Sequence, residues 1–191
     1  MPPGSMSRTL EETPIAVIDL ETTGLLAGGD RVVEVSLVRI NPGEEPRLLL
    51  DTLINPERPM AATEIHGIRD EDVVDAPRFR DVAGELVRGL HGAILASFNV
   101  YFDAAFLRYE LSRSGIDRLP PYICLMYLRP MLSLGTRCSL DDACRAHGID
   151  HAQSHQAASD ALSAAQLWSI YLDAARRSNI RTFEELARLK S

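Results

Sequence analysis

The chain has 191 residues and a formal net charge of −7, from 20 basic and 27 acidic residues. Its 46% hydrophobic and 25% charged residues are ordinary for a soluble globular protein, which excludes collagen, low-complexity disorder and a disulfide-dense miniprotein. Three cysteines without a CxxC spacing argue against a disulfide framework or a zinc knuckle. An acidic chain is at first sight a poor partner for nucleic acid, but acids gathered at a metal site are neutralised by the cation they hold.

The chain predicts one domain with short additions at its ends. Residues 1–12 contain charges and no apolar run, so we expect a flexible leader that is not a signal peptide. No apolar stretch is long enough to cross a membrane, and we therefore expect a cytoplasmic protein without membrane partners. No linker interrupts residues 13–177, which we expect to form the main domain, and residues 178–191 are expected to add a C-terminal helical extension.

The first third of the domain predicts strands. Apolar, β-branched runs cover residues 15–20, 32–40 and 47–54, and the turn signals Gly28-Gly29-Asp30 and Asn41-Pro42-Gly43 separate them. Short connections between successive strands favour an antiparallel meander.

The rest of the chain alternates helices with short strands. Apolar spacing and capping residues predict helical turns or helices over 60–67, 70–74, 78–90, 103–113, 139–147 and 156–177, and a last helix opened by a capping box at 182–185. Short apolar runs predict strands at 93–98 and 123–126. A meander followed by strands that alternate with helices predicts an α/β fold, in which a mixed five-stranded sheet joins the meander to two parallel strands and carries helices on both faces.

Two carboxylates stand at the end of the first predicted strand. Asp19 and Glu21 are separated by one residue, and residues i and i+2 of a strand point to the same face of a sheet. Like charges this close repel each other unless a cation lies between them, and carboxylate oxygens suit Mg²⁺ or Mn²⁺ better than zinc. The alternative is a solvated strand end that leads into a turn.

Three further candidates follow later in the chain. Asp103 comes after a predicted strand at the start of a helix, where an acid also simply favours the helix dipole. His155 and Asp160 are five residues apart, which on one regular helix would turn their side chains about 140° away from each other. If both serve one site, His155 must lie in the loop before the helix and Asp160 on its first turns. The alternatives are a surface histidine and an exposed helix acid.

Together these segments resemble the three exonuclease motifs of the DEDDh (DnaQ-like) 3′→5′ exonucleases, a family that includes the proofreading subunit of bacterial DNA polymerase III, ribonuclease T and oligoribonuclease. The resemblance rests on VIDLETTGL with Asp19 and Glu21, on NVYFDAAFL with Asp103, and on HQAASDA with His155 and Asp160. It extends over roughly 13–172 and implies a ribonuclease H-like fold.

The resemblance also implies two-metal hydrolysis of phosphodiester bonds. Asp19 would bridge two divalent cations, Mg²⁺ or Mn²⁺. Glu21 and Asp160 would complete the site that holds the attacking water, and Asp103 would anchor the other cation. Neutral His155 would be the general base that takes a proton from this water. The products would be nucleoside 5′-monophosphates, released one at a time from a 3′ end.

The residues that the resemblance assigns to substrate binding lie beside the first two motifs: Thr22, Thr23, Leu25, Ile65, His66, Asn99 and Phe102. The backbone N–H of Thr22 would hold the terminal 3′-OH, and Leu25 would wedge beneath the last base, because frayed or single-stranded ends unstack easily. Ile65 and His66 would flank that base. The alternative for Leu25 and Ile65 is that they are plain core residues. Two positions depart from common family patterns, Phe98 and Ser159.

Other histidines and aromatic residues are expected to be structural. Their spacings match no zinc pattern, which predicts ordinary polar or capping roles for His66, His91, His147 and His151. Trp168, Tyr171 and Leu172 on the long helix are expected in the core or at an interface, which leaves a homodimer open.

These observations favour a metal-dependent 3′→5′ exonuclease of the proofreading or repair type, with DNA as the favoured substrate, single-stranded 3′ ends as partners and a DNA polymerase as a candidate partner. RNA 3′-end trimming or degradation of short oligoribonucleotides is the alternative, since no feature specifies discrimination at a 2′-OH. Two non-catalytic alternatives remain, because fold does not imply function. They are a single-strand-binding module and a partner protein that docks through its C-terminal helix.

Overall fold

The structure is a computed structural model that describes residues 7–151 and 155–189. Five strands form one sheet in the order β3-β2-β1-β4-β5. The antiparallel strands are β1 (Ile15–Thr22), β2 (Val32–Ile40) and β3 (Arg47–Leu53), whereas β4 (Ile94–Ser97) and β5 (Tyr122–Cys124) continue the sheet in parallel. The predicted α/β fold, with a three-strand meander and two parallel strands, is confirmed.

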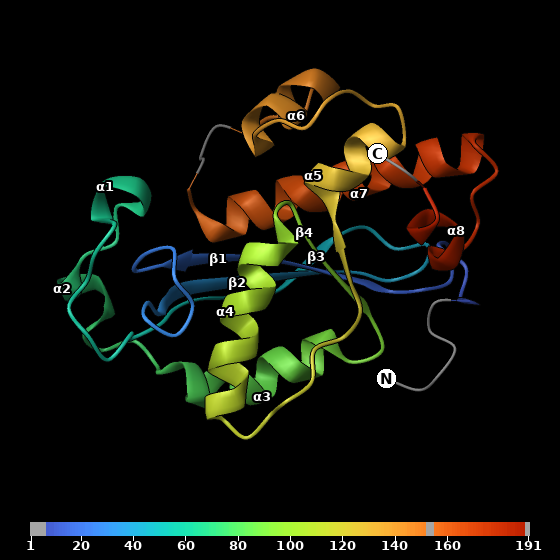
Figure 1. Cartoon of the computed structure of the whole chain (residues 1–191). Helices are drawn as coiled ribbons and strands as arrows, with labels where there is room; N and C mark the ends of the chain where they lie inside the picture. Colours follow the sequence, from blue (N-terminus) through green and yellow to red (C-terminus); the bar gives the residue numbers. More distant parts are fainter. Residues whose placement is uncertain (1–6, 152–154, 190–191) are drawn as a thin grey trace.

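Helices cover both faces of this sheet, as predicted. The helices of the described residues are α1 (Thr63–His66), α2 (Asp70–Val73), α3 (Phe79–Leu90), α4 (Val100–Arg113), α5 (Leu125–Met131), α6 (Leu140–His147), α7 (Ala157–Arg177) and α8 (Phe183–Ala187). Figure 1 shows the long helix α7 on one side of the sheet and α3 with α4 on the other. No helix within the described ranges is long and apolar enough to cross a membrane.

The central strand β1 explains why two helical layers are needed. Ile15 and Val17 join Trp168 of α7 in one core cluster, whereas Ile18 joins Phe79 of α3 in the other. β1 is therefore apolar on both faces, which is typical of a strand in a sheet whose two faces are both covered by helices. The odd-numbered residues of β1 face α7, and this face carries Asp19 and Glu21 at its far end.

The strand predicted at 123–126 is wrong in its second half. β5 ends at Cys124, and a helix that the sequence analysis did not predict, α5, begins at Leu125. Leu125, Leu128 and Leu132 are all buried, at the i, i+3, i+7 spacing of one helix face. A short apolar run fits a strand and a buried helix equally well, so only the packing distinguishes them.

Both ends of the described chain are tied to the core. Leu10 is buried, and its N–H donates to the carbonyl oxygen of Arg181 at 2.8 Å. In the C-terminal extension, Phe183 of α8 stacks on Trp168 with ring centroids 6.3 Å apart. Leu10 thus belongs to the folded unit although it lies within the predicted leader, whereas residues 1–6 lie outside the described residues. The domain boundaries themselves stay predictions.

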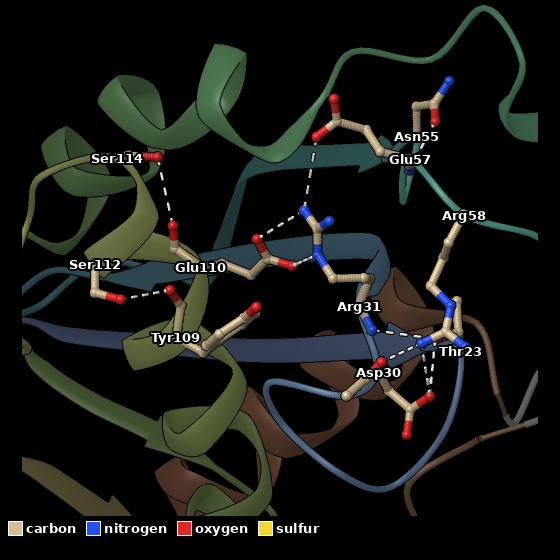
Figure 2. Close-up of polar contacts among 11 residues, drawn as sticks. Thr23, Asp30, Arg31, Asn55, Glu57, Arg58, Tyr109, Glu110, Ser112 and Ser114 are labelled. Atoms are coloured by element: carbon tan, nitrogen blue, oxygen red, sulfur yellow. Dashed lines mark hydrogen bonds and ion pairs between the residues drawn. The ribbon is translucent and has the colours of Figure 1, made fainter.

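A buried ion pair fixes the loop that follows β1 (Figure 2). Arg31 donates from Nε and Nη2 to the two carboxylate oxygens of Glu110 on α4, at 2.6 and 3.1 Å. The Glu110 side chain is 2% exposed and that of Arg31 11% exposed. The backbone N–H of Arg31 also donates to Thr23 Oγ1 at 3.1 Å, which closes the loop onto its own start. This bidentate geometry is the strong form of a charged hydrogen bond.

Asp30 holds the tip of the same loop (Figure 2). Its Oδ2 accepts the N–H of Leu26 at 3.0 Å, and its Oδ1 lies 3.2 Å from Arg58 Nη1. A Cβ on Gly24 would lie 2.5 Å from Asp30 Oδ2, so this close approach requires glycine. Leu25 and Leu26 are consequently presented to solvent, with Leu25 84% exposed.

Candidate functional site

The site begins on β1, which extends two residues beyond its predicted end. Asp19 and Glu21 therefore lie within the strand, and Glu21 is directly opposite Glu34 of β2. Glu34 Oε2 accepts the N–H of Ala157, the first residue of α7, at 3.2 Å. Glu34 thus adds a carboxylate to the site and docks the start of α7 onto the sheet. The sequence analysis missed it, although an acid inside the apolar run of β2 is a visible signal.

Asp103 reaches the same end of the sheet from α4. This helix begins at Val100, three residues earlier than predicted, so Asp103 lies within its first turn. The Ser97 hydroxyl at the end of β4 donates to Asp103 Oδ2 at 2.5 Å, and the Asp103 residue is only 4% exposed. The Asp103 carboxylate also accepts a hydrogen bond from the backbone of Leu20, which directs it toward β1.

His155 and Asp160 lie as their spacing required. His155 occupies a left-handed turn (φ 64°) before Gln156, the N-cap of α7, and Asp160 lies in the first turn of that helix. One ligand atom from each of Glu21, His155 and Asp160 lies within 4.8 Å of the others. The structure thus brings together residues from β1, from the turn before α7 and from α7 itself.

Burial and neighbouring acids raise the pKa values of Asp19 and Glu21. Burial raises the pKa of Asp19 well above its ordinary value, and four nearby carboxylates raise it further: Asp103, Asp160, Glu21 and Glu34. Burial also raises the pKa of Glu21 from 4.5 to about 8, again with a contribution from Asp160. These shifts show that the carboxylates share one poorly solvated region.

The other two acids have partners that favour the ionised form. Burial raises the pKa of Asp103 to about 7, and the hydrogen bond from Ser97 opposes this rise. Burial likewise raises the pKa of Asp160, against hydrogen bonds from His151 and from the backbone of His155. Such strongly perturbed carboxyls in one place are a mark of a functional site.

The donor set fits divalent cations. Carboxylate oxygens dominate it, with one imidazole, and hard oxygen ligands of this kind select Mg²⁺ or Mn²⁺. A cation would also relieve the mutual repulsion that the raised pKa values of Asp19 and Glu21 report.

Replacement of Glu21 by glutamine is expected to stabilise the metal-free protein at alkaline pH. The folded-state pKa of Glu21, about 8, lies above its ordinary value of 4.5, so its contribution to stability is present at low pH and is lost as pH rises through about 8. Glutamine cannot ionise, and the variant should therefore lose less stability between pH 5 and 9. Thermal unfolding in EDTA across this pH range measures the difference, with the exposed Glu71→Gln as control. The same pH slope in wild type and Glu21→Gln would contradict the prediction.

The residues predicted to bind substrate fall into two groups. Thr22 and Thr23 are buried beside the acids, and the Thr22 hydroxyl donates to the Gly24 carbonyl oxygen at 2.6 Å. Leu25 and Ile65 are exposed, Ile65 by 52%, so the alternative that they are core residues is wrong.

Asn99 and Phe102 flank the start of α4. Asn99 is exposed and is the N-cap residue of the helix, whereas Phe102 is partly buried and packs on Phe106 with ring centroids 4.9 Å apart. Phe102 therefore has a packing role whatever else it contacts.

His66 has a buried ring nitrogen without a hydrogen-bond partner among the described residues and lies close enough to His155 for that ring to affect its pKa. Its Nδ1 accepts the N–H of Ile68 at 3.0 Å, while its Nε2 is buried without a hydrogen-bond partner in the described part of the chain. Burial lowers the pKa of His66, and His155 adds to this effect. The neutral ring thus carries its proton on Nε2, as a donor that a bound molecule can satisfy.

His151 has a more specific place than the ordinary polar role predicted for it. Its ring lies between Asp141 of α6 and Asp160 of α7, with a 2.6 Å contact on each side. No spacing in the sequence signals this arrangement, because three segments must fold together to create it.

A mixed five-stranded sheet of this order, with helices on both faces, is a fold of the ribonuclease H-like class. The sequence model of the family described as "RNase_T: Exonuclease" matches residues 16–168. The chain belongs to this exonuclease family, and the predicted DnaQ-like relationship is confirmed.

Similar curated proteins support the assignment to this family. The DNA polymerase III subunit epsilon of Rickettsia typhi is 30% identical over 179 residues, covering 88% of this chain and 78% of the relative. The DNA polymerase III subunit epsilon-like protein of Rhodobacter capsulatus is 32% identical over 91% of this chain, which spans 26% of that protein. The chain spans only 14% of the PolC-type DNA polymerase III of Thermotoga petrophila, with which it is 29% identical.

Solved structures share the fold. Escherichia coli exonuclease I in complex with a dA16 oligonucleotide matches 88% of this chain and 42% of its own, with a TM-score of 0.72 and 17% identity. Exonuclease X in complex with 5′ overhanging duplex DNA matches 91% of this chain and 97% of its own, with a TM-score of 0.67 and 24% identity.

Proposed function

We propose that this chain is a metal-dependent 3′→5′ exonuclease that acts on DNA and releases nucleoside 5′-monophosphates. The observation that carries the proposal is the cluster formed by Asp19, Glu21, Asp103 and Asp160 beside His155, in which neighbouring acids raise the pKa values of Asp19 and Glu21. An acidic chain can bind a polyanion at such a place only if cations intervene, which the donor set favours.

In this proposal the acids divide between two cation sites. Glu21 and Asp160 would hold one cation and Asp103 the other, with Asp19 shared by both. When bound, Mg²⁺ or Mn²⁺ supplies charge neutralisation at the phosphoryl oxygens and lowers the pKa of a bound water. His155, exposed on its turn and close to Glu21 and Asp160, would accept the proton of that water through a ring nitrogen.

The loop after β1 would select the chain end. Leu25, exposed on a loop that Asp30 and Arg31 hold rigid, is suited to inserting beneath a terminal base. Ile65 offers a second apolar contact, and His66 offers its unpaired Nε2–H to an oxygen of the terminal nucleotide. A free 3′ end would bind between these side chains and the backbone of Thr22.

DNA is the favoured substrate because the relatives that cover most of this chain carry DNA polymerase III names. The polymerase partner and the homodimer stay predictions. A direct test compares 5′-labelled single-stranded DNA, mismatched duplex DNA and RNA of the same sequence, each with Mg²⁺ or Mn²⁺. We expect stepwise shortening from the 3′ end. An oligonucleotide whose 3′ end is blocked should not be shortened. Faster RNA shortening would favour the RNA-trimming alternative, and binding without cleavage would favour a single-strand-binding module.

Replacement of His155 by alanine is expected to lower the rate of cleavage by about 10²- to 10⁴-fold, the range typical of general-base removal. The chemical step would lose its proton acceptor, while substrate binding at Leu25 and Thr22 would be retained. Single-turnover cleavage at saturating Mg²⁺ measures this rate. His91→Ala, an exposed histidine remote from the acids, is the matched control. A wild-type rate in His155→Ala would exclude the assigned role.

A further inference from the structure

His151 occupies a buried position between two acids on different helices. Its side chain is only 4% exposed. Nε2 lies 2.6 Å from Oδ1 of Asp160, and Nδ1 lies 2.6 Å from Oδ1 of Asp141. Asp141, in the first turn of α6, is 47% exposed. A hydrogen-bonded chain therefore runs from the surface of α6 through the imidazole to the acid cluster.

This arrangement restricts the Asp160 carboxylate. An imidazole with a partner on each nitrogen cannot rotate without breaking a bond, so it holds both carboxylates in one orientation. The contact of His151 is with Oδ1 of Asp160 and does not use Oδ2. Asp160 also accepts from the backbone of His155, the turn that brings His155 toward Glu21. Both contacts act on the acid that α7 contributes to the site.

The two contacts of His151 also distinguish its role from that of His155. Both ring nitrogens of His151 already face a carboxylate oxygen, so neither is free to bind a cation. His155 is exposed, and one of its ring nitrogens lies within 4.8 Å of the ligand atoms of Glu21 and Asp160. The roles therefore differ: His155 faces the reacting groups, and His151 faces one of the acids from behind.

We propose that His151, anchored by Asp141, is a positioning residue that fixes the Asp160 carboxylate for divalent-cation binding. The inference rests on the proposed function, since it assigns a cation to Asp160. Partners behind a metal ligand typically change metal affinity or activity by about 10- to 100-fold when removed. A carboxylate that is already oriented also loses less conformational freedom when the cation binds.

The primary test measures Mn²⁺ binding to the full chain without substrate, by calorimetry or by electron paramagnetic resonance. His151→Ala should weaken binding about 10-fold or more. His151→Gln, whose amide can donate near the position of Nε2, should recover part of the loss. His91→Ala should bind as wild type does. With DNA present, His151→Ala should regain activity when Mn²⁺ is raised and should keep its KM for DNA.

Asp141→Asn tests the hydrogen bond between Asp141 and His151. It replaces His151→Ala as the test if that variant fails to fold. It should weaken Mn²⁺ binding in the same direction, because it weakens the anchor of the ring. Asp142→Asn removes the same charge from the same helix but from an acid paired with Arg145, and should leave binding unchanged. Equal effects of Asp141→Asn and Asp142→Asn would overturn the proposal, since a general charge effect would then explain both.

Asp160→Asn separates failure of this inference from failure of the proposed function. If Asp160→Asn loses Mn²⁺ binding while His151→Ala and His151→Gln bind as wild type does, the positioning role is overturned and the cation site stands. If Asp160→Asn itself binds Mn²⁺ as wild type does, the cation assignment behind the proposed function is overturned as well.

Discussion

Replacement of Asp19 by asparagine is expected to lower the rate of exonuclease cleavage by about 10²- to 10³-fold, the order seen when a group that stabilises transition-state charge is removed. Asp19 lies on the central strand, where the other acids of the site all act on its pKa. Asparagine keeps its shape and removes its charge, so the shared cation sites would lose their common ligand. Repulsion within the cluster would fall at the same time, and the fold should persist.

Single-turnover cleavage of a 5′-labelled oligonucleotide measures this rate, with far-UV circular dichroism as a check on folding. Asp173→Asn is the matched control, because Asp173 is an exposed acid of α7 that pairs with Arg176. Persistent wild-type cleavage in Asp19→Asn would remove the basis of the proposed function.

Replacement of Glu110 by alanine is expected to lower the free energy of unfolding by about 3–5 kcal/mol, the cost of leaving one member of a buried ion pair without its partner. Arg31 would keep a buried positive charge whose only remaining acidic partner among the described residues is Glu57, at 3.9 Å, and the bidentate contact that ties the β1–β2 loop to α4 would be lost. In a chain of this size each kcal/mol corresponds to roughly 2–4 °C in Tm, so thermal and urea unfolding both resolve the change.

Glu184→Ala provides the contrast on the surface. Glu184 pairs with Arg188 one turn away on the C-terminal segment, where both side chains are more than half exposed. Exposed pairs of this spacing contribute only about 0.3–0.5 kcal/mol. If Glu110→Ala destabilises the protein no more than Glu184→Ala does, the buried pair does not anchor the loop. Arg31→Met combined with Glu110→Leu should recover much of the loss, because apolar residues of similar volume often replace a buried pair well.

Burial of charge has opposite effects on stability at the acid cluster around Asp19 and at the ion pair of Arg31 and Glu110. Glu110 is buried with an opposite charge, whereas the acids around Asp19 are buried with like charges. The second arrangement lowers the stability of the metal-free protein, and strongly perturbed carboxyls of this kind are typical of functional sites. This contrast explains why neutralising Glu21 is expected to stabilise the protein while removing Glu110 is expected to destabilise it.

Local spacing determined much of the site in advance. The i, i+2 pair of Asp19 and Glu21 follows from strand geometry alone. If His155 and Asp160 serve one site, their five-residue separation excludes one regular helix for both, and His155 does lie in a turn before α7. The meander and the helices on both faces likewise follow from periodicity and short connections, because these features depend on neighbours in the sequence.

Only the tertiary structure decided which groups share an environment. Glu34 faces Glu21 through strand register, Ser97 orients Asp103 across the sheet, and His151 reaches Asp160 only once α6 and α7 lie together. The helix that begins directly after β5 also escaped prediction, since its apolar run fits two periods. Burial and charge interactions depend on distances between residues far apart in the chain, and the sequence alone does not contain those distances.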